Sequence, residues 1–368
     1  MKKKILFLAP GLVVGGAEKF LVSLMNRLDK EQFDIVLAVL SDNNPLLNQV
    51  ESGIPVKVYS RKSKFDVSPI VELRGLLKEI KPDIVFCLGL FPFFFLQLAS
   101  LLIGSTFRKL ISYHSTVYHT KKDDRLARMY FKMIDKDTHV IPVSENQREY
   151  TIDRFGVAGN IFTTIHNGVD VDFWTNCPAQ AIREETRLKY DIPLEAKVVV
   201  QTAAFRPEKN HVAALKALHV INTKENAEKL YLLLVGDGQC RKIIENTIKE
   251  LQLQPYVRMA GIQRDVRPFY WCADFFSLTS YSIETFSIAA LEAMSTGLPC
   301  ALTDIGGANE MIVSGKNGLL CSPDYESIAE VWEQMMNTAY NPIDIRSYIQ
   351  SRFSEKGMVD AYTRFFKS

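Results

Sequence analysis

The sequence lacks a CxxC pair and any cysteine spacing typical of a metal site. Its six cysteines are scattered, and most fall within apolar runs that suggest strands or helices. Buried, reduced thiols of a cytosolic protein are the expected state of Cys87, Cys177, Cys240, Cys272, Cys300 and Cys321.

The sequence also lacks a strong net charge, a low-complexity tract and an internal repeat. At a formal charge of +2, nothing indicates nucleic acid as a partner. A content of 47% hydrophobic and 23% charged residues is typical of a soluble globular protein, and 368 residues suggest two domains. Residues 1–180 hold 23 basic and 19 acidic side chains and the rest hold 21 and 23, which mildly favours an anionic partner for the first half, such as a membrane surface.

The N-terminal stretch "MKKKILFLAPGLVV" resembles a secretory leader but lacks a small-residue cleavage site. Pro10 and Gly11 interrupt its apolar run, and a helical pattern follows directly. We therefore expect a first β-strand here. We also expect a cytoplasmic protein that could lie peripherally on the inner face of the cell membrane.

A second apolar stretch, Ile84 to Gly104, is long enough to span a bilayer. Pro92 and Gln97 interrupt it, and "KPDIVFC" is typical of a buried parallel strand, so a strand, a turn and a helix are favoured over a membrane span. Its aromatic residues could lie against lipid headgroups beside nearby basic side chains. The residues concerned are Phe91, Phe93, Phe94 and Phe95, with Arg61, Lys62, Lys64, Arg108, Lys109, Lys121 and Lys122.

Short apolar runs alternate with stretches of helical spacing along the whole chain, in two series separated by a polar passage at Asp170 to Glu195. This alternation predicts parallel sheets with right-handed crossovers, hence an α/β protein with two doubly wound Rossmann-like domains facing a cleft. Strands are predicted at residues 4–9, 33–40, 55–60, 83–88, 109–114, 139–144, 162–167, 196–203, 230–236, 257–261, 274–280, 299–304 and 318–322.

We place the domain boundary within the polar passage, giving domains at residues 1–175 and 176–352. An amphipathic C-terminal helix at about 353–368 could pack back on the first domain. Ligands of such sheets collect outside the carboxyl ends of the strands. The expected site is therefore the cleft between the two domains.

Several turns after predicted strands could hold a phosphate. In "PGLVVGGAEKF", Gly15 and Gly16 open a helix whose first amides could bind an anion, although such a turn is often only a turn. The dinucleotide fingerprint GxGxxG is absent, which disfavours a nicotinamide site. In "AAFRPEKNH", Arg206 and Lys209 end a strand and suit a diphosphate, although this motif alone is better explained as a solvated helix start. The "GDG" at residues 236–238 is best explained as a turn.

The stretch "YSIETFSIAALEAMSTGLPCALTDIGG" places two carboxylates in and beside an apolar helix. Glu292 either bonds within the core or accepts from the two hydroxyls of a ribose, and Glu284 can point into the cleft. Gly306 and Gly307 form a further strand-to-helix turn, which could hold another phosphate.

Taken together, these motifs resemble retaining glycosyltransferases of the GT-B fold, the family 4 group, also called glycosyl transferases group 1. The E-x7-E spacing of Glu284 and Glu292 carries the resemblance, and further motifs follow in the family's order: "GGAEK", "VSENQ", "HNGVDVDFW", "RPEKNH" and "GDG". The resemblance covers nearly the whole chain, and the combination is specific although each motif is weak.

The resemblance implies a role for each candidate residue. Lys209 and a nearby arginine would bind the diphosphate of a nucleotide-sugar donor, while Glu292 would bind its ribose. Glu284 would face the donor sugar, and His114, in "ISYHST", would contact the transferred sugar. The first domain would bind the acceptor and the second domain would bind the donor.

Two departures from the family pattern affect these roles. The family commonly has Gly-Arg-Leu where this chain has Ala-Ala-Phe, so the usual arginine position is Ala204 and Arg206 is the candidate substitute. The family often has Glu-Gly-Phe where this chain has Glu-Thr-Phe, and Thr285 changes the walls around the sugar.

The implied reaction is transfer of a hexose-type sugar from a nucleotide diphosphate donor, with a UDP-sugar favoured by family habit and with retention at the anomeric carbon. Lys209, Arg206 and the amides of Gly16 and Gly307 would stabilise charge on the leaving group, which would accept the proton of the acceptor. No cofactor or metal is expected, because the DxD at residues 170–172 is interpreted as linker structure.

The apolar, basic first domain fits a lipid-linked glycan acceptor in bacterial surface polysaccharide assembly. A nucleotide-sugar epimerase of the same fold remains an alternative, although no acid/base pair for it is identified. A catalytically silent binding partner is a second alternative, which the presence of Lys209, Glu284 and Glu292 disfavours.

Overall fold

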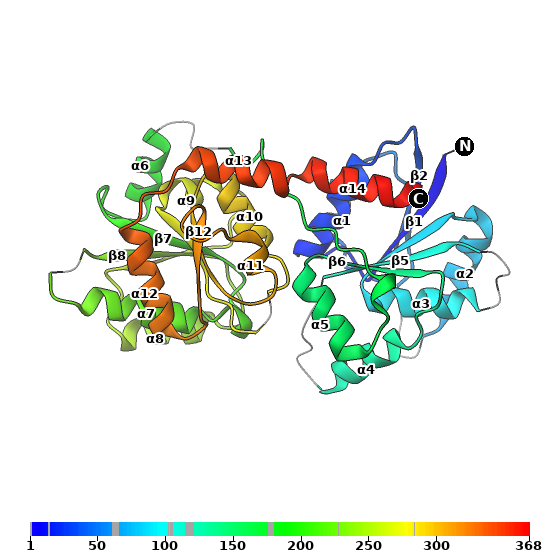
Figure 1. The fold of residues 1–368 in the computed structure, drawn as a ribbon, viewed down its shortest axis with the longest axis horizontal. Coiled ribbons are helices and arrows are strands. Elements are labelled where there is room, and N and C mark those ends of the chain that lie inside the picture. Colours follow the sequence, from blue (N-terminus) through cyan, green and yellow to red (C-terminus); the bar gives the residue numbers. More distant parts are fainter. Residues whose placement is uncertain are drawn as a thin grey trace. The chain divides into compact units, whose positions relative to one another are not determined.

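The computed structural model of the protein describes residues 2–13, 15–60, 66–101, 103, 106–114, 121–175, 180–226, 228–282 and 284–368. The chain forms two compact units (Figure 1). Unit 1 comprises Met1–His166 with Met358–Ser368, and unit 2 comprises Asn167–Gly357. The division therefore falls before the boundary expected at residue 175, and the chain returns to unit 1 at its C-terminal end.

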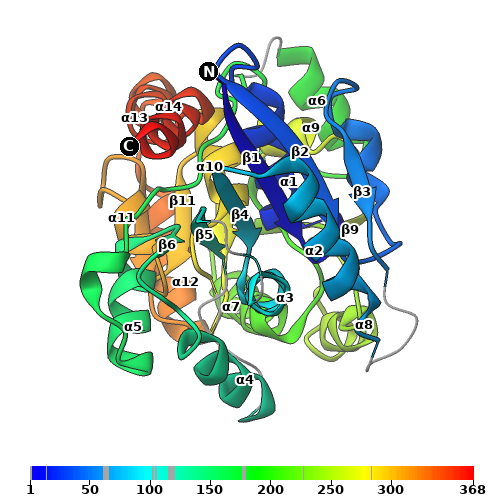
Figure 2. The same ribbon diagram turned by 90° about the vertical axis from the view of Figure 1, so that its right-hand side faces the viewer.

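Each unit contains a six-stranded sheet whose neighbouring strands are all parallel, which confirms the predicted doubly wound α/β class. The order in unit 1 is β3-β2-β1-β4-β5-β6, which can be followed in Figure 2, and the order in unit 2 is β12-β11-β10-β7-β8-β9. The strands of unit 1 are β1 (Lys3–Ala9), β2 (Phe33–Val39), β3 (Val56–Val58), β4 (Ile84–Leu88), β5 (Arg108–Tyr113) and β6 (Thr138–Pro142). Those of unit 2 are β7 (Lys197–Thr202), β8 (Leu230–Val235), β9 (Val257–Gly261), β10 (Phe275–Leu278), β11 (Cys300–Thr303) and β12 (Gly318–Cys321).

One predicted strand, residues 162–167, is not a strand. Phe162 forms only an isolated bridge to Val140, and the amides of Thr163 and Ile165 donate to the carbonyls of Val140 and Pro142. The segment therefore runs beside the end of β6 without extending the sheet. Its apolar residues fill the edge of the core, which explains why it carries a strand-like pattern.

Helices cover both faces of each sheet, because alternate residues of a strand point to opposite faces. The helices of unit 1 are α1 (Gly16–Arg27), α2 (Ser68–Ile80), α3 (Leu90–Ser100), α4 (Lys121–Phe131), α5 (Glu145–Phe155) and, from Met358 on, α14 (Glu355–Lys367). In β1, Ile5 and Phe7 pack with α1 and α14, whereas Leu6 and Leu8 pack with α2, α3 and α4. Those of unit 2 are α6 (Gln180–Lys189), α7 (His211–Thr223), α8 (Arg241–Glu250), α9 (Arg267–Cys272), α10 (Ile288–Ser295), α11 (Ala308–Met311), α12 (Tyr325–Met336) and α13 (Pro342–Arg352).

The C-terminal helix α14 packs into the core of unit 1. Its residues Tyr362 and Phe366 lie against Phe86 of β4, with ring centroids 5.7 and 5.9 Å away. Lys3 of β1 donates to the last carbonyls of the helix, those of Phe366 at 2.9 Å and Lys367 at 2.8 Å. A cation at this end complements the helix dipole, so both ends of the chain stabilise the same core.

The apolar stretch from Ile84 folds as β4, a turn at Gly89 with a φ of 91°, and α3, which confirms the predicted strand, turn and helix. Phe93 and Phe95 are buried in the core of unit 1, so the suggestion that they face lipid headgroups is wrong. Phe91 and Phe94 are half-buried and pack on the same cluster. Among the described residues, no helix is long and apolar enough to cross a membrane.

The basic residues expected beside these phenylalanines differ in their contacts and exposure. Lys109 pairs with Asp135, and Arg108 donates to the carbonyl of Phe365 on α14 at 3.1 Å. Lys121 and Lys122 are exposed at the start of α4. Three others, together with the terminal glycine of the apolar stretch, lie outside the described residues: Arg61, Lys62, Lys64 and Gly104.

The cysteines within the described residues are free thiols, and burial raises the pKa of most of them. Cys87, Cys272, Cys300 and Cys321 are buried, and Cys240 is half-buried. Cys177 lies outside the described residues.

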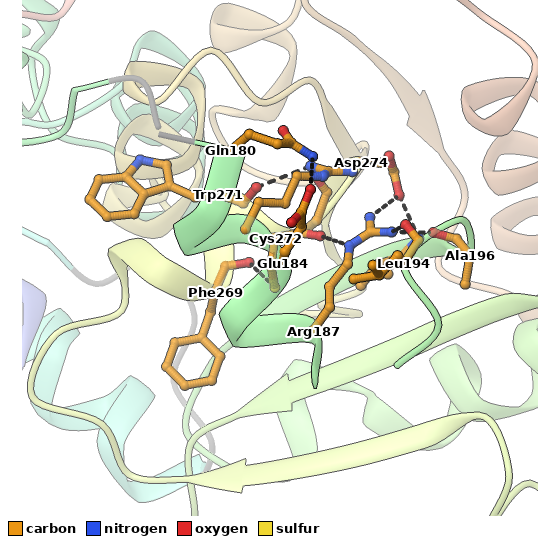
Figure 3. A network of polar contacts seen from close by, with 12 residues as sticks. Gln180, Glu184, Arg187, Leu194, Ala196, Phe269, Trp271, Cys272 and Asp274 are labelled. Atoms are coloured by element: carbon orange, nitrogen blue, oxygen red, sulfur yellow. Dashed lines mark hydrogen bonds and ion pairs between the residues drawn. The ribbon is translucent and has the colours of Figure 1, made fainter. Parts of the chain in front are cut away.

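The polar passage between the two predicted series contains a helix, α6, that the strand pattern did not indicate. Its Arg187 is only 2% exposed and binds Asp274 at 3.0 Å, and Arg183 binds the same carboxylate at 2.8 Å (Figure 3). Asp274 also accepts from the amide of Val198 at 2.8 Å, and Arg187 donates to the carbonyl of Cys272 at 2.9 Å. This arginine–aspartate cluster ties α6 and α9 to the amino ends of β7 and β10.

Candidate functional site

Lys209 and Glu284 form an ion pair at the carboxyl edge of the unit 2 sheet. Lys209 ends the short 3-10 helix Pro207–Lys209 that follows β7, and Glu284 lies in the loop between β10 and α10. The Lys209 Nζ lies 2.6 Å from the Glu284 Oε2, and the hydroxyl of Ser280 donates to the same oxygen at 3.1 Å. Their side chains are 22% and 16% exposed, so the pair is partly shielded yet reachable by a ligand.

The backbone around Lys209 is held by its own hydrogen bonds. The Gln201 side-chain amide and the Thr279 hydroxyl both donate to the Lys209 carbonyl, at 3.2 and 3.1 Å. Gln201 and Thr279 are fully buried at the ends of β7 and β10. Adjacent strands of the sheet thus fix the position from which Lys209 reaches Glu284.

Gly306 packs directly against the backbone of Glu284. Its φ is 55°, in the left-handed region, and a Cβ added there would overlap the Glu284 carbonyl oxygen. The next amide, that of Gly307, donates to the Thr285 carbonyl at 2.9 Å. The turn before α11 therefore shapes the loop that carries Glu284, and the Gly307 amide is already engaged within the protein.

Replacing Gly306 with alanine is expected to destabilise the protein by about 2–3 kcal/mol, because the left-handed conformation is strained for alanine and the new methyl group displaces the Glu284 backbone. Gly315 is a matched control, since its φ is 73° and no atom lies within 4 Å of an added Cβ. Thermal unfolding of both variants measures the difference. An equal loss of stability in Gly306→Ala and Gly315→Ala would show that the overlap of the new methyl group with the Glu284 backbone adds no cost.

The "GDG" turn after β8 is structural, as predicted. Gly236 has a φ of 141°, and a Cβ there would overlap the Ala203 carbonyl oxygen. The Asp237 carboxylate accepts from Nε and Nη2 of Arg241, at 2.8 and 2.9 Å. The close approach of this turn to the chain after β7 explains its two glycines.

Arg206 lies at the surface beside the site. Its side chain is 64% exposed, and its guanidinium is 4.0 Å from the Glu208 carboxylate. Ala204, at the family's arginine position, accepts the Arg206 amide at 2.8 Å through its carbonyl. The long Arg206 side chain is thus available from the loop that presents Lys209, although it is not in the Lys209–Glu284 pair.

Glu292 is half-buried on α10, and a tyrosine hydroxyl meets its carboxylate. Tyr270 of α9 donates to the Glu292 Oε2 at 3.3 Å and also shares a 2.7 Å hydrogen bond with Thr202. Burial and the nearby Glu292 carboxylate raise the pKa of Tyr270 well above its usual range, so the phenol stays protonated. The sequence pattern did not indicate this tyrosine partner.

His211 is a buried histidine next to the site that the sequence analysis did not single out. It begins α7, is 2% exposed, and packs edge-on against Phe205 with ring centroids 4.9 Å apart. Neither ring nitrogen has a hydrogen-bond partner within the part of the chain that the structure describes. Burial, with Lys209 adding to the effect, lowers the pKa of His211 to about 4.

Because of His211, we expect the free energy of unfolding to fall in acid. Because its pKa falls from 6.5 unfolded to about 4 folded, the unfolded chain binds the extra proton as the pH drops through this window. The free energy of unfolding should fall by about 3 kcal/mol between pH 6.5 and 4 through this group. His211→Leu should remove that part of the pH dependence. His219→Leu, at a half-buried histidine whose Nδ1 donates to the Leu251 carbonyl at 3.2 Å, should keep it. Parallel urea titrations at several pH values decide this, and an unchanged profile for His211→Leu would contradict it.

In unit 1, Gly15 and Gly16 begin α1 as predicted, but a side chain already lies over this helix end. A Cβ on Gly15 would collide with the Oε2 of Glu18, so that carboxylate sits against the first turn. Burial raises the pKa of Glu18, and a hydrogen bond from its own backbone amide opposes the rise. An anion bound at Gly15 and Gly16 would lie next to the Glu18 carboxylate.

His114 follows β5 and lines a cavity of about 420 Å3 at the carboxyl ends of β1, β4 and β5. It shares a 2.9 Å hydrogen bond with Ser112 through Nε2 and packs on Phe20, with ring centroids 4.7 Å apart. Burial lowers the pKa of His114 to about 3, so the ring is neutral near pH 7. The candidate residues thus form two groups, one in each unit.

The DxD carboxylates both take part in local structure. Asp170 accepts from the amides of Asp172 and Phe173, at 3.2 and 3.1 Å, and Asp172 lies 3.5 Å from Arg346. Within the described ranges, no three His, Cys, Asp or Glu side chains gather as a metal site would need.

Comparison with known proteins identifies the family. The family of glycosyl transferases group 1 matches residues 182–351, and glycosyltransferase family 4 matches residues 14–173. The two matched stretches are separated only by residues 174–181 and together cover most of the chain. The chain therefore belongs to the group 1, family 4 type of glycosyltransferases, and it is a transferase of the GT-B fold.

Three relatives illustrate the range of this group. The N-acetyl-alpha-D-glucosaminyl L-malate synthase of Bacillus anthracis is 35% identical over 38% of this chain and 36% of its own length. The lipopolysaccharide core biosynthesis glycosyltransferase LpsE of Rhizobium meliloti is 29% identical over 50% of this chain and 53% of its own. The UDP-Gal:alpha-D-GlcNAc-diphosphoundecaprenol alpha-1,3-galactosyltransferase of Escherichia coli is 24% identical over 84% and 81%.

Solved structures show the same fold. HepE of Anabaena, in complex with UDP, has a TM-score of 0.84 at 20% identity and covers all of both chains. The lipopolysaccharide outer core galactosyltransferase WaaB, in its apo form, has a TM-score of 0.78 at 19% identity and covers 99% of this chain and all of that one. These likenesses confirm the expected GT-B architecture of two parallel-sheet domains.

Proposed function

We propose that the protein transfers a hexose-type sugar from a UDP-sugar to a glycan acceptor, with retention at the anomeric carbon and without a metal. The observation that carries the donor part is the Lys209–Glu284 pair at the carboxyl edge of the unit 2 sheet. Such an edge is where ligands of parallel sheets bind. The pair offers an ammonium for a diphosphate and a carboxylate for sugar hydroxyls at neighbouring positions.

In this proposal, the bond from the anomeric carbon to the diphosphate oxygen breaks, and a bond to the acceptor hydroxyl forms on the same face. The leaving diphosphate takes the proton of that hydroxyl. Lys209 stabilises the charge that grows on the diphosphate, with Arg206 reaching in from its exposed position. The Tyr270 hydroxyl orients one carboxylate oxygen of Glu292, and this carboxylate binds the ribose.

The choice of UDP draws on the relatives. HepE is solved with UDP and with UDP-glucose, and the Escherichia coli relative is named for a UDP-Gal donor. The lipid-linked acceptor and the role in bacterial surface polysaccharide assembly draw on the same relative's diphosphoundecaprenol substrate and on the lipopolysaccharide enzyme LpsE. Peripheral contact with the inner face of the cell membrane would bring the protein to such an acceptor.

Donor turnover tests the proposal. The protein is incubated with UDP-glucose, UDP-galactose and UDP-N-acetylglucosamine, each with and without EDTA and together with a glycoside acceptor such as p-nitrophenyl N-acetylglucosaminide. UDP release and the anomeric proton of the glycosylated acceptor are followed by NMR. We expect UDP release from one donor, unchanged by EDTA, and an axial glycosidic product from an axial donor. Interconversion of two donors without UDP release would instead identify an epimerase, and no turnover with no UDP binding would identify a silent binding partner.

A further inference from the structure

The cavity in unit 1 has a size and lining suited to a sugar. Its volume of about 420 Å3 falls within the range of about 300–1,000 Å3 that small-molecule sites span. Phe91, Pro92 and Tyr130 form apolar and aromatic walls, and Leu90 and Leu126 complete them. Flat aromatic rings next to a few polar groups can pack on the apolar face of a sugar ring while the polar groups bind its hydroxyls.

The charged side chains among the described residues that line this cavity are carboxylates. Among the described lining residues, the carboxylates are Glu18 and Asp123, and no lysine or arginine takes part. His114 adds no positive charge, because its pKa is about 3. Lys121 and Lys122 precede Asp123 on α4, but both are exposed and neither lines the cavity.

The start of α1 could attract an anion here, but the Glu18 carboxylate lies against it. A helix N-terminus favours negative charge through its amides and dipole. The Glu18 carboxylate lies against Gly15 and accepts a hydrogen bond from its own backbone amide. The protein therefore already supplies a negative group at this helix N-terminus. A carboxylate or phosphate entering the cavity would meet this carboxylate and that of Asp123, and like charges at close range repel.

We propose that the cavity binds an uncharged, hydroxyl-rich sugar of the acceptor and rejects a sugar or small acid that carries a carboxylate or phosphate there. The sugar ring packs on Phe91 and Tyr130, and its hydroxyls donate to Glu18 and Asp123. This inference rests on the proposed function, since an acceptor matters only to a transferase. It concerns the sugar inside the cavity alone, so a diphosphate elsewhere in a lipid-linked acceptor is compatible with it.

A matched pair of ligands tests the inference on the full chain. p-Nitrophenyl glucoside and p-nitrophenyl glucuronide differ only by the carboxylate at C6, and L-malate, named in the Bacillus anthracis relative, is a second anionic probe. The p-nitrophenyl N-acetylglucosaminide is a second neutral probe. Affinities are measured by saturation-transfer NMR, with and without UDP. We expect the wild type to prefer the neutral glycosides by about tenfold or more, which corresponds to about 1.4 kcal/mol.

The variants Glu18→Gln and Asp123→Asn, singly and together, should reduce this preference to about threefold or less. Asp34→Asn, at an exposed carboxylate of β2 outside the cavity, should leave it unchanged. Unchanged thermal stability of each variant, measured alongside, shows that it is folded.

Three results would overturn the inference. These are equal or tighter binding of the glucuronide or L-malate by the wild type, no binding of either neutral glycoside by protein that binds UDP, and an unchanged preference in the double variant. Failure of the proposed function is seen separately, as a lack of UDP binding and of donor turnover. The ratio of the affinities for the neutral and the anionic glycoside, measured without UDP, does not depend on whether the protein binds UDP or turns over a donor.

Discussion

Replacing Lys209 with methionine is expected to lower donor turnover by about 10²–10³-fold, because a preorganised cation that meets growing negative charge supplies about 3–4 kcal/mol of transition-state stabilisation. Binding of UDP should weaken as well, by about 10- to 100-fold, as expected when a charged hydrogen bond is lost. Methionine keeps the length and the apolar stem of the side chain. The loss therefore reports on the ammonium that lies 2.6 Å from Glu284.

The matched control is Lys242→Met, at an exposed lysine on α8 of the same unit. It removes one positive charge without touching the pair, so UDP affinity and turnover should stay close to wild type. Titration calorimetry with UDP and a coupled assay for UDP release measure both quantities. Turnover of the Lys209 variant within a factor of three of wild type would remove Lys209 from the proposed reaction.

Replacing Asp274 with alanine is expected to lower the free energy of unfolding of unit 2 by about 3–5 kcal/mol, the usual cost of leaving a buried charge without its partner. Arg187 is 2% exposed and burial lowers its pKa, so the carboxylate at 3.0 Å is what compensates its buried charge. The same change removes the acceptor of the Val198 amide and of Arg183. Several elements at the amino end of the sheet would lose their common anchor.

Glu184→Ala is the control for this stability prediction. Glu184 lies on the same helix, and Gln180 donates to it at 3.3 Å near the surface (Figure 3). Its removal should cost no more than about 0.5 kcal/mol, as is usual for surface substitutions. Urea unfolding followed by fluorescence compares the two variants, and a cost below about 1 kcal/mol for Asp274→Ala would show that the cluster is not a major source of stability.

The predicted strands were recognisable because buried parallel strands carry unbroken apolar runs, as in β4 and β8. The same signal failed at residues 162–167, where apolar side chains pack beside β6 but the backbone forms only an isolated bridge and two hydrogen bonds to it. It also misled for Phe93 and Phe95, since an apolar helix can face a core as well as a lipid layer. A hydrophobic pattern indicates that side chains are buried, but it does not identify the surface against which they pack.

The pairings in the candidate site could not be read from local pattern. Lys209 and Glu284 are 75 positions apart, and Arg187 and Asp274 are 87 apart, so only the folded sheet brings them together. No motif marked the tyrosine partner of Glu292, and "GGAEK" did not indicate that the Glu18 carboxylate lies over Gly15. What the sequence did contain was the family pattern, which marked Lys209, Glu284 and Glu292 as candidates without showing their contacts.

Thermal unfolding with nucleoside diphosphates tests the central claim most directly. Wild type and Glu292→Ala are compared with UDP, GDP, ADP and CDP, each with and without EDTA. A ligand at about 100 times its Kd stabilises the folded state by about 2.7 kcal/mol, which is a readily measured shift in Tm. We predict that UDP stabilises the wild type without metal and that Glu292→Ala loses most of this effect. No shift with any of the four diphosphates, or an equal shift in the variant, would contradict the account of the donor site.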